Sequence, residues 1–293
     1  HRRRRRHARV SSPAAEGGGV MAAARRWPTL FIPHGGGPCF FMDPMPGLPP
    51  DLWDRMAAYL RGLDGSLGER PAAILVVSGH WEAPQPTVNV AEKPALLFDY
   101  SGFPEHTYRL TYPVAGSPVL ANRVRALLDA AGFHSSEDRT RGLDHGVFVP
   151  LKVIYPAADV PLVQLSLDIS RDPARHLAIG RALAPLRDEG VLIVGSGMSY
   201  HNLREFFADR RESNHAAEDF DAWLNDILVN KAAKERETGL TVWRSAPGAR
   251  ASHPTPEHLL PLHVAVGAAL EDPGTRTYSD RLLGKPISGF QFG

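Results

Sequence analysis

Short, nearly continuous apolar runs alternate along the chain with longer segments in which apolar residues recur at helical spacing. The runs are rich in β-branched residues and span residues 29–34, 72–80, 161–167 and 190–201. Runs of this kind are typical of strands that are covered on both faces. The pattern therefore predicts a mainly parallel sheet buried between helices.

The segments between and after these runs have the periodicity of amphipathic helices. They cover residues 50–63, 117–132, 173–190, 216–235 and 256–270. Ser117 and Pro118 have the pattern of an N-cap and a first helical residue, and Gly132 and Gly190 stand where helix C-caps belong. Internal repeats and long polar linkers are absent from the sequence. We expect one α/β domain over residues 27–293, with helices on both faces of its sheet.

Residues 1–26 differ from the rest of the chain. They are rich in Arg and Ala and have no apolar periodicity, so we expect a disordered extension. The interpretation we favour is that Met21 is the natural start. The alternative is an organelle transit peptide, because such peptides are rich in Arg and Ser and poor in acidic residues.

Charge and cysteine content narrow the function classes. Of 33 basic and 32 acidic residues, eight Arg and one Glu fall in residues 1–26, which leaves 25 basic and 31 acidic residues in the body. That balance does not favour a nucleic-acid surface. The chain has one cysteine, Cys39, and no run approaching the ~18 apolar residues of a membrane span. We expect a soluble, cytoplasmic protein that binds neither nucleic acid nor a membrane.

Histidines mark the ends of three predicted strands, at His34, His80 and His201. Ligand sites form where the carboxyl ends of strands meet in an open α/β sheet, and neutral imidazole is the commonest metal ligand near pH 7. One such histidine is most simply a structural residue. Three together, most of them beside glycine, indicate a metal or catalytic site.

Further histidines fall outside the predicted strands. His145 lies in a turn-like segment, and His258 and His263 lie on the last predicted helix. His263 and Trp81 are weak candidates for substrate contact, with packing in the core as the alternative. We expect His106 and His253 to be exposed or loop residues. We expect ordinary surface positions on helices or turns for His134, His176 and His215.

The sequence "HGGG" at residues 34–37 also occurs in the oxyanion loops of esterases, which carry their serine in Gly-x-Ser-x-Gly. Here Val194 and Met198 stand where the two glycines around Ser196 would be needed. The esterase interpretation therefore fails, and a metal site remains.

Six segments then carry a family resemblance. They read "FIPHGGGP", "VVSGHWE", "YSGFPEHTY", "RGLDHGVFVPLKVIYPAADVPLVQLSL", "GSGMSYHNLR" and "HPTPEHLLPLHVAVGAA". In this order they resemble the class III extradiol ring-cleavage dioxygenases, and more narrowly the DOPA 4,5-dioxygenase branch. The resemblance extends over about residues 27–293. It implies a mixed sheet, one non-haem metal ion and the opening of a catechol ring with O₂.

The resemblance also implies roles for single residues. His34, His80 and His258 match the metal ligands of the family, and His201 matches a histidine that serves as a ligand or in proton transfer. His145 matches an acid/base or substrate-binding histidine. Glu257 is the alternative last ligand, because two histidines and one carboxylate form the common non-haem Fe(II) site.

The expected cofactor is Fe(II), and Zn²⁺ could occupy the same ligands in isolated protein. The expected substrates are O₂ and a small catechol related to DOPA or caffeate. A zinc hydrolase that uses the same histidines is the rival enzyme class. A metal-binding protein without catalysis is the non-enzymatic rival.

Overall fold

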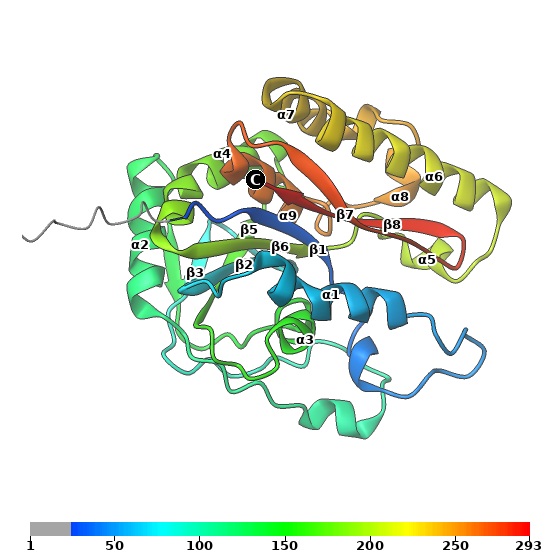
Figure 1. Ribbon diagram of the computed structural model, residues 1–293, viewed down its shortest axis with the longest axis horizontal. Helices are drawn as coiled ribbons and strands as arrows, with labels where there is room; N and C mark the ends of the chain where they lie inside the picture. The colour runs from blue at the N-terminus through cyan, green and yellow to red at the C-terminus, as the bar shows by residue number, and fades with distance from the viewer. Residues whose placement is uncertain (1–24) are drawn as a thin grey trace, which may run out of the picture.

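The computed structural model describes residues 25–293, so the disorder expected for residues 1–26 falls almost entirely outside the described residues. The described chain forms one sheet whose strands follow the order β4-β3-β5-β2-β6-β1-β8-β7 (Figure 1). The strands are β1 (Thr29–Pro33), β2 (Ala73–Ala83), β3 (Thr87–Asn89), β4 (Ser136–Asp138), β5 (Leu162–Asp168), β6 (Val191–Gly197), β7 (Gly274–Leu282) and β8 (Lys285–Phe292).

The centre of the sheet is parallel and its flanks are mixed. Strands β5, β2, β6 and β1 pair in parallel, as do β3 and β4. Strand β8 runs antiparallel to both β1 and β7, and β3 runs antiparallel to β5. The prediction of a mixed, mainly parallel sheet in a single α/β domain is confirmed.

Helices cover both faces of the sheet, as predicted (Figure 1). One face carries α1 (Asp54–Leu67) and α3 (His145–Ile154), and the other carries α2 (Pro118–Ala130), α4 (Pro173–Leu183) and α9 (Leu260–Ala269). The remaining α-helices are α5 (Leu203–Phe206), α6 (Arg211–Asn225), α7 (Ala233–Thr241) and α8 (Ala249–Ser252).

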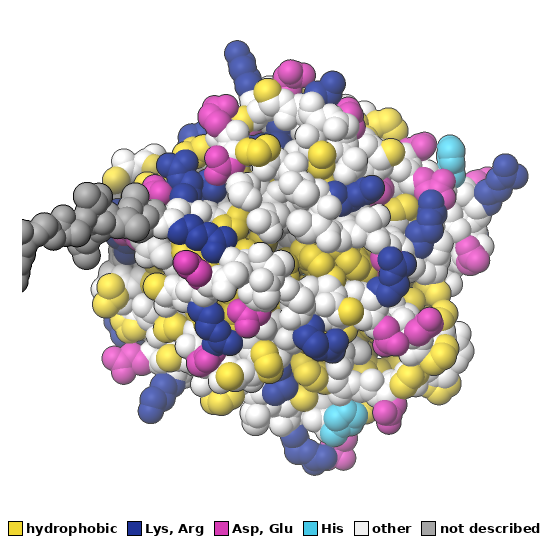
Figure 2. Space-filling view, viewed as in Figure 1, with side chains coloured by type: hydrophobic (Ala, Val, Ile, Leu, Met, Phe, Trp, Pro, Cys, Tyr) yellow, Lys and Arg dark blue, Asp and Glu magenta, His cyan; other side chains and the backbone are white. Residues whose placement is uncertain are grey.

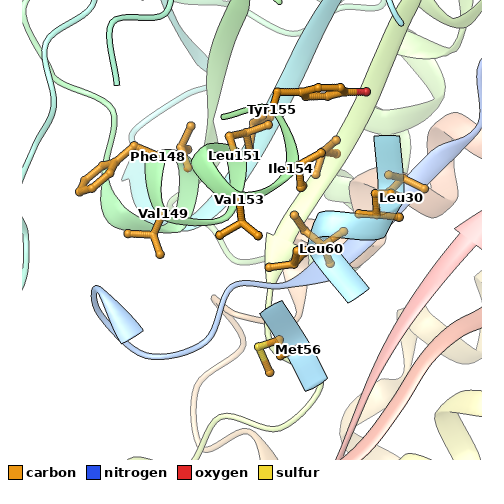
Figure 3. Close-up of a cluster of buried hydrophobic side chains, with 14 of the residues drawn as sticks. Leu30, Met56, Leu60, Phe148, Val149, Leu151, Val153, Ile154 and Tyr155 are labelled. Carbon is orange, nitrogen blue, oxygen red and sulfur yellow. The ribbon is translucent and has the colours of Figure 1, made fainter. Parts of the chain in front are cut away.

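Successive side chains of the central strands enter different cores, since a strand alternates its faces. Ile74 and Val76 of β2 pack with α1 and α3, whereas Leu75 and Val77 pack with α2, α4 and α9. The first core is built around α3, nine of whose ten residues are buried. Figure 3 shows side chains leaving α3 on several sides, with Leu30 of β1 and two side chains of α1 nearby.

The predicted caps are present where the chain turns. The Ser117 hydroxyl accepts a hydrogen bond from the Leu120 amide, and Pro118 begins α2. Gly190 has a φ of 82°, in the left-handed region that favours glycine, and it ends the 3₁₀ turn Ala184–Glu189 before β6.

Several predicted boundaries were wrong. Strand β2 continues past His80, and β6 ends at Gly197, four residues before His201. Helix α9 begins at Leu260, so His258 lies in the preceding turn rather than on the helix. The helix predicted over 173–190 ends as a 3₁₀ turn, and the one predicted over 216–235 is divided by a π turn at Asp226–Asn230.

The sequence patterns also missed several elements. Helix α3 is apolar apart from His145 and Lys152, so its sequence resembles a continuous apolar run more than an amphipathic helix. The edge hairpin β7–β8 has a two-residue turn in which Leu283 and Gly284 both have positive φ. The three-residue strands β3 and β4 and the four-residue helices α5 and α8 were missed as well.

The surface mixes charges of both signs. Figure 2 shows basic and acidic side chains interspersed over the face that it presents. Within residues 25–293, no helix combines the length and apolar character needed to cross a membrane.

Candidate metal centre and active site

The carboxyl ends of β1, β2 and β6 lie side by side and carry the first histidines of the site. Pro33 pairs with Gly197, and Ser78 pairs with Ser196. His34 directly follows β1, and its amide donates to the Gly197 carbonyl at 3.1 Å. The ring centres of His34 and His80 are 5.0 Å apart, as expected for side chains that leave one edge of the sheet.

A bulge in β2 sets the position of His80. Between Val77 and Glu82, β2 advances five residues while its partner β5 advances two, from Leu165 to Leu167. Such bulges re-aim side chains and are frequent beside active sites. The segment is held by a hydrogen bond from the His80 amide to the Ser78 hydroxyl, at 3.1 Å.

His258 completes a triangle of imidazoles. Its ring centre is 5.2 Å from that of His34 and 4.7 Å from that of His80. The Nε2 atoms of His80 and His258 are 3.2 Å apart. Two nitrogens that bind one ion at about 2.1 Å and near-tetrahedral angles are separated by roughly 3.2–3.5 Å. The spacing therefore fits two ligands of one metal ion.

Unsatisfied nitrogens support the same conclusion. His34 is buried, and neither of its ring nitrogens has a hydrogen-bond partner among the described residues; Nδ1 of His258 also has none. Buried polar atoms are normally paired, so exceptions point to a missing partner. An ion bound by His34 would supply a partner for one of its ring nitrogens, whereas Nδ1 of His258 lies on the side of Glu257 and not of the triangle.

Two glycines allow the His258 turn to approach the sheet. A Cβ at Gly79 would lie 2.8 Å from the Glu257 carbonyl oxygen and 3.2 Å from the His258 Cα. A Cβ at Gly197 would lie 2.1 Å from the His258 carbonyl oxygen. All three distances are below ordinary van der Waals contact. The ring of His258 reaches the site because β2 and β6 carry no side chain at these points.

The imidazoles of the triangle are kept neutral. Burial, with the neighbouring His80, His145 and His201 rings, lowers the pKa of His34 well below its usual value. Burial and the nearby histidines also lower the pKa of His258 well below its usual value, and that of His80 to about 4. Neutral imidazole is the form that binds a metal, so the site is ready for a cation at neutral pH.

His145 is oriented by a carboxylate. It is the first residue of α3, and Asp99 accepts hydrogen bonds from its backbone amide at 3.0 Å and from Nδ1 at 2.6 Å. Burial opposes ionisation of Asp99, but the hydrogen bonds from His145 outweigh it and lower the pKa of this carboxyl. With its proton on Nδ1, His145 keeps Nε2 free to accept another proton.

His201 stacks on His258 rather than completing the triangle. Their ring centres are 3.4 Å apart and the planes are inclined by 8°. Burial lowers the pKa of His201. Two sets of potential ligand atoms fall within 4.8 Å of one another, namely His34, His80 and His145, and His201, Glu257 and His258.

Glu257 approaches His258 from the other side. Its Oε1 atom is 3.9 Å from Nδ1 of His258, the nitrogen that does not face His80. The same oxygen accepts a hydrogen bond from the Thr255 hydroxyl at 2.9 Å. The ring of His258, and not the carboxylate of Glu257, therefore lies beside the rings of His34 and His80.

The two weak candidates for substrate contact do not reach the cavity. Trp81 is buried with the Arg141 guanidinium 4.7 Å from its ring centre. His263 is buried in α9, with Nε2 2.9 Å from the Leu240 carbonyl oxygen and Nδ1 3.2 Å from that of Leu259. Both side chains pack in the protein interior.

Two other histidines are buried, although His176 was expected at the surface and His253 in an exposed position or a loop. His176 is fully buried, and its Nε2 accepts a hydrogen bond from the Asp168 amide. His253 is buried against Phe220 and Trp243, with Nε2 2.8 Å from the Ser199 carbonyl oxygen. Their surroundings come from distant parts of the chain, which local sequence patterns do not reveal.

A buried network behind the histidines was not predicted. Asp144 is fully buried, caps α3 at the Gly146 amide, and accepts hydrogen bonds from Ser78 and Gln164. Arg141 joins Asp144 to the His80 carbonyl oxygen, with both contacts at 3.1 Å. An Asp directly before the histidine is an N-cap signal, and it could have revealed that a helix begins at His145.

All five site histidines line one cavity of about 470 Å³. Cys39 also lines it, and burial raises the pKa of its thiol to about 12, so it is not a nucleophile. Ser196 is fully buried and donates its hydroxyl to the Gly146 carbonyl, which agrees with the exclusion of an esterase.

Comparison with known proteins identifies the family. Residues 28–290 match the family described as the catalytic LigB subunit of aromatic ring-opening dioxygenase. The chain belongs to this family. It is an extradiol ring-opening dioxygenase, and the family resemblance seen in the sequence is confirmed.

Several relatives support the assignment. The 4,5-DOPA dioxygenase extradiol of Beta vulgaris is 46% identical over 70% of this chain and 75% of its own length. The dioxygenase tasH of Hapsidospora irregularis is 39% identical over 91% of this chain and 85% of its own. The 4,5-DOPA dioxygenase extradiol of Escherichia coli K12 is 37% identical over 85% and 88%.

A solved structure shares the fold. The crystal structure of an uncharacterized protein from Escherichia coli K12 superposes with a TM-score of 0.70 at 31% identity. The match covers 92% of this chain and all of the other chain. The domain described above is therefore that of a LigB-type protein.

Proposed function

We propose that this dioxygenase opens the ring of a small catechol with O₂ at one Fe(II) ion held by His34, His80 and His258. The observation that carries the proposal is the triangle of neutral imidazoles, two buried and one partly exposed, whose ring centres are 4.7–5.2 Å apart at the base of the cavity. When bound, iron would supply the Lewis acidity and the redox chemistry that unite the ring diol with O₂.

His145 is proposed as the general base. Its Nδ1 proton is held by Asp99, so Nε2 can accept a proton from a catechol hydroxyl. The carboxylate then stabilises the imidazolium, as in other His–Asp pairs. His145 also lies close to the proposed ligands, with its ring centre 4.0 Å from that of His80.

His201 is proposed to donate or accept a hydrogen bond at the substrate rather than to bind the ion. It lines the cavity, and its ring lies flat against the ligand His258. The same contact fixes the direction of both rings. The apolar walls above the histidines exclude water from the reacting groups.

The test is reconstitution with Fe(II) under argon, followed by addition of O₂ and a panel that includes L-DOPA, caffeate and 4-methylcatechol. The expected result is O₂ uptake together with a yellow, ring-opened product. Zn²⁺ binds the same imidazoles but does not cycle electrons, so Zn²⁺-loaded protein should be inactive. O₂-independent hydrolysis of a model ester by Zn²⁺-loaded protein, without O₂ uptake, would instead identify the hydrolase.

A further inference from the structure

The walls of the cavity differ sharply in chemistry from its base. Above the histidines the lining is dominated by large apolar side chains. They include Met42, Met45, Leu48, Trp53, Phe206 and Phe207. Trp53 and Phe206 stack with their ring centres 6.4 Å apart and their planes inclined by 10°.

Among the described residues that line the cavity, none is Lys, Arg, Asp or Glu. Arg141, which lies behind His80, is already bound to Asp144 and to the His80 carbonyl. A carboxylate or ammonium group that leaves water without a partner is strongly disfavoured. Among these lining residues, therefore, no Lys, Arg, Asp or Glu side chain is present to form an ion pair with a charged substituent on the catechol.

The mouth of the cavity carries apolar side chains that face solvent. Seven large hydrophobic residues are exposed in the described chain, and three of them, Met45, Leu203 and Phe207, line this cavity. Leu203 is 66% exposed and Phe207 is 61% exposed. Exposed apolar residues that gather at one opening, unlike scattered ones, mark a binding surface.

Volume and flexibility fit an extended ligand. Cavities of about 300–1,000 Å³ hold ligands of drug size, so 470 Å³ exceeds what a bare catechol ring fills. Three methionines, Met42, Met45 and Met198, line the walls. Their unbranched, polarisable side chains adapt to irregular apolar shapes.

We infer that the substrate is a catechol with an uncharged, extended apolar substituent, which lies between the Met42–Leu48 segment and α5 with Phe207. The inference rests on the proposed function, because that function places the catechol ring on the histidines. It adds the chemical class of the remainder of the substrate, and it distinguishes this site from one built for an amino-acid or carboxylate tail.

The test compares 3-(3,4-dihydroxyphenyl)propanoate with its methyl, propyl and butyl esters, which share the ring and linker. Binding to metal-loaded protein is measured by calorimetry under argon. We expect the propyl ester to bind at least tenfold more tightly than the acid. We also expect affinity to rise by about fourfold per methylene along the ester series. Equal or tighter binding of the acid, or no dependence on length, would overturn the inference.

Variants at the mouth locate the substituent. Phe207→Ala should flatten the dependence of affinity on ester length, and Leu203→Lys should raise the affinity of the acid relative to the esters. Ile169→Ala is the matched control, because Ile169 is 57% exposed but does not line the cavity. An unchanged length dependence in Phe207→Ala would show that the substituent lies elsewhere.

The binding series tests the inference about the substituent, and the O₂-uptake measurement tests the proposed function, so either claim can be refuted without the other. A preference for esters without any O₂ uptake by Fe(II)-loaded protein would support the inference about the cavity and refute the proposed function. Ring opening with equal kcat/KM for the acid and its esters would do the reverse. The comparison of kcat/KM therefore accompanies the binding measurement.

Discussion

At the scale of single residues, the site depends on buried imidazoles that lack ordinary partners. His34 illustrates this, since both of its nitrogens are unpaired within the described chain and burial disfavours its charged form. Without a cation, such a residue costs free energy. With one, the same burial makes it a better ligand, because no proton competes for the nitrogen.

The choice between His258 and Glu257 as a ligand can be tested directly. His258→Ala should lower Fe(II) content by at least tenfold and abolish ring opening, because it removes one corner of the triangle. Glu257→Gln should retain the metal, since its carboxylate faces Nδ1 of His258 and not the triangle. Metal content by mass spectrometry after gel filtration provides the measurement. Metal loss in Glu257→Gln with retention in His258→Ala would reverse the assignment.

Asp99 is expected to act through His145. Asp99→Asn keeps the shape of the side chain but removes the charge that orients His145 and stabilises its imidazolium. Loss of such a partner typically lowers activity by about 10–100-fold. We expect a fall of this size in kcat with unchanged Fe(II) content, measured by O₂ uptake. Asp159→Asn, at an exposed ion pair with Arg70, is the control, and an equal loss of kcat there would refute the role of Asp99.

At the scale of elements, the site is assembled where strand ends and one turn approach within van der Waals contact. The parallel arrangement of β1, β2 and β6 follows from their continuous hydrophobicity, and it brings His34 and His80 together. The turn before α9 adds His258 from more than 170 residues away along the chain from His80. Gly79 and Gly197 are the points at which these elements meet.

Gly79→Ala tests this contact between elements. The added methyl group would meet the Glu257 carbonyl at 2.8 Å, so the turn must shift and move His258. We expect a loss of stability of about 1–3 kcal/mol and weaker metal retention. Gly62→Ala, on the exposed face of α1 with no heavy atom nearby, should instead stabilise by about 0.5–1 kcal/mol. Urea unfolding and metal content distinguish the two variants. Normal metal retention in Gly79→Ala would contradict the conclusion that close packing at Gly79 positions His258.

At the scale of the whole molecule, the fold buries histidines far from the cavity as well as in it. Burial outweighs the carbonyl contacts of His263 and lowers its pKa to about 4, and burial also lowers the pKa of His176. His263 therefore stays neutral in the folded protein under mildly acidic conditions. The unfolded chain takes up protons at these positions once the pH falls below about 6.5.

Stability should therefore decline as the pH falls through this range. Between pH 6.5 and about 4 the unfolded state binds a proton at His263 that the folded state does not bind, so each pH unit costs about 1.4 kcal/mol. His263→Gln, which retains a donor for the Leu240 carbonyl, should have a shallower slope by that amount. The measurement is urea unfolding of metal-free protein at several pH values. His134→Gln, at an exposed histidine, should match the wild type, and identical slopes for all three proteins would refute the prediction.

The sequence by itself determined the α/β class, the central parallel strands, the cap at Ser117 and the histidines that gather at the site. These features depend on local periodicity and on which residue types stand at strand ends. The family could be inferred from the order of the motifs. Helix α3 and the β7–β8 hairpin were missed because a nearly continuous apolar run and edge pairing leave weak local patterns.

Only the tertiary structure decided where each histidine lies relative to the others. His258 joins the triangle, His145 pairs with Asp99, and His263 packs in the interior, although all three are simply histidines within apolar sequence. The difference arises from contacts between residues that are far apart in the chain. Burial, spacing between nitrogens and the approach of one turn to two glycines are properties of the folded state, so no local pattern encodes them separately.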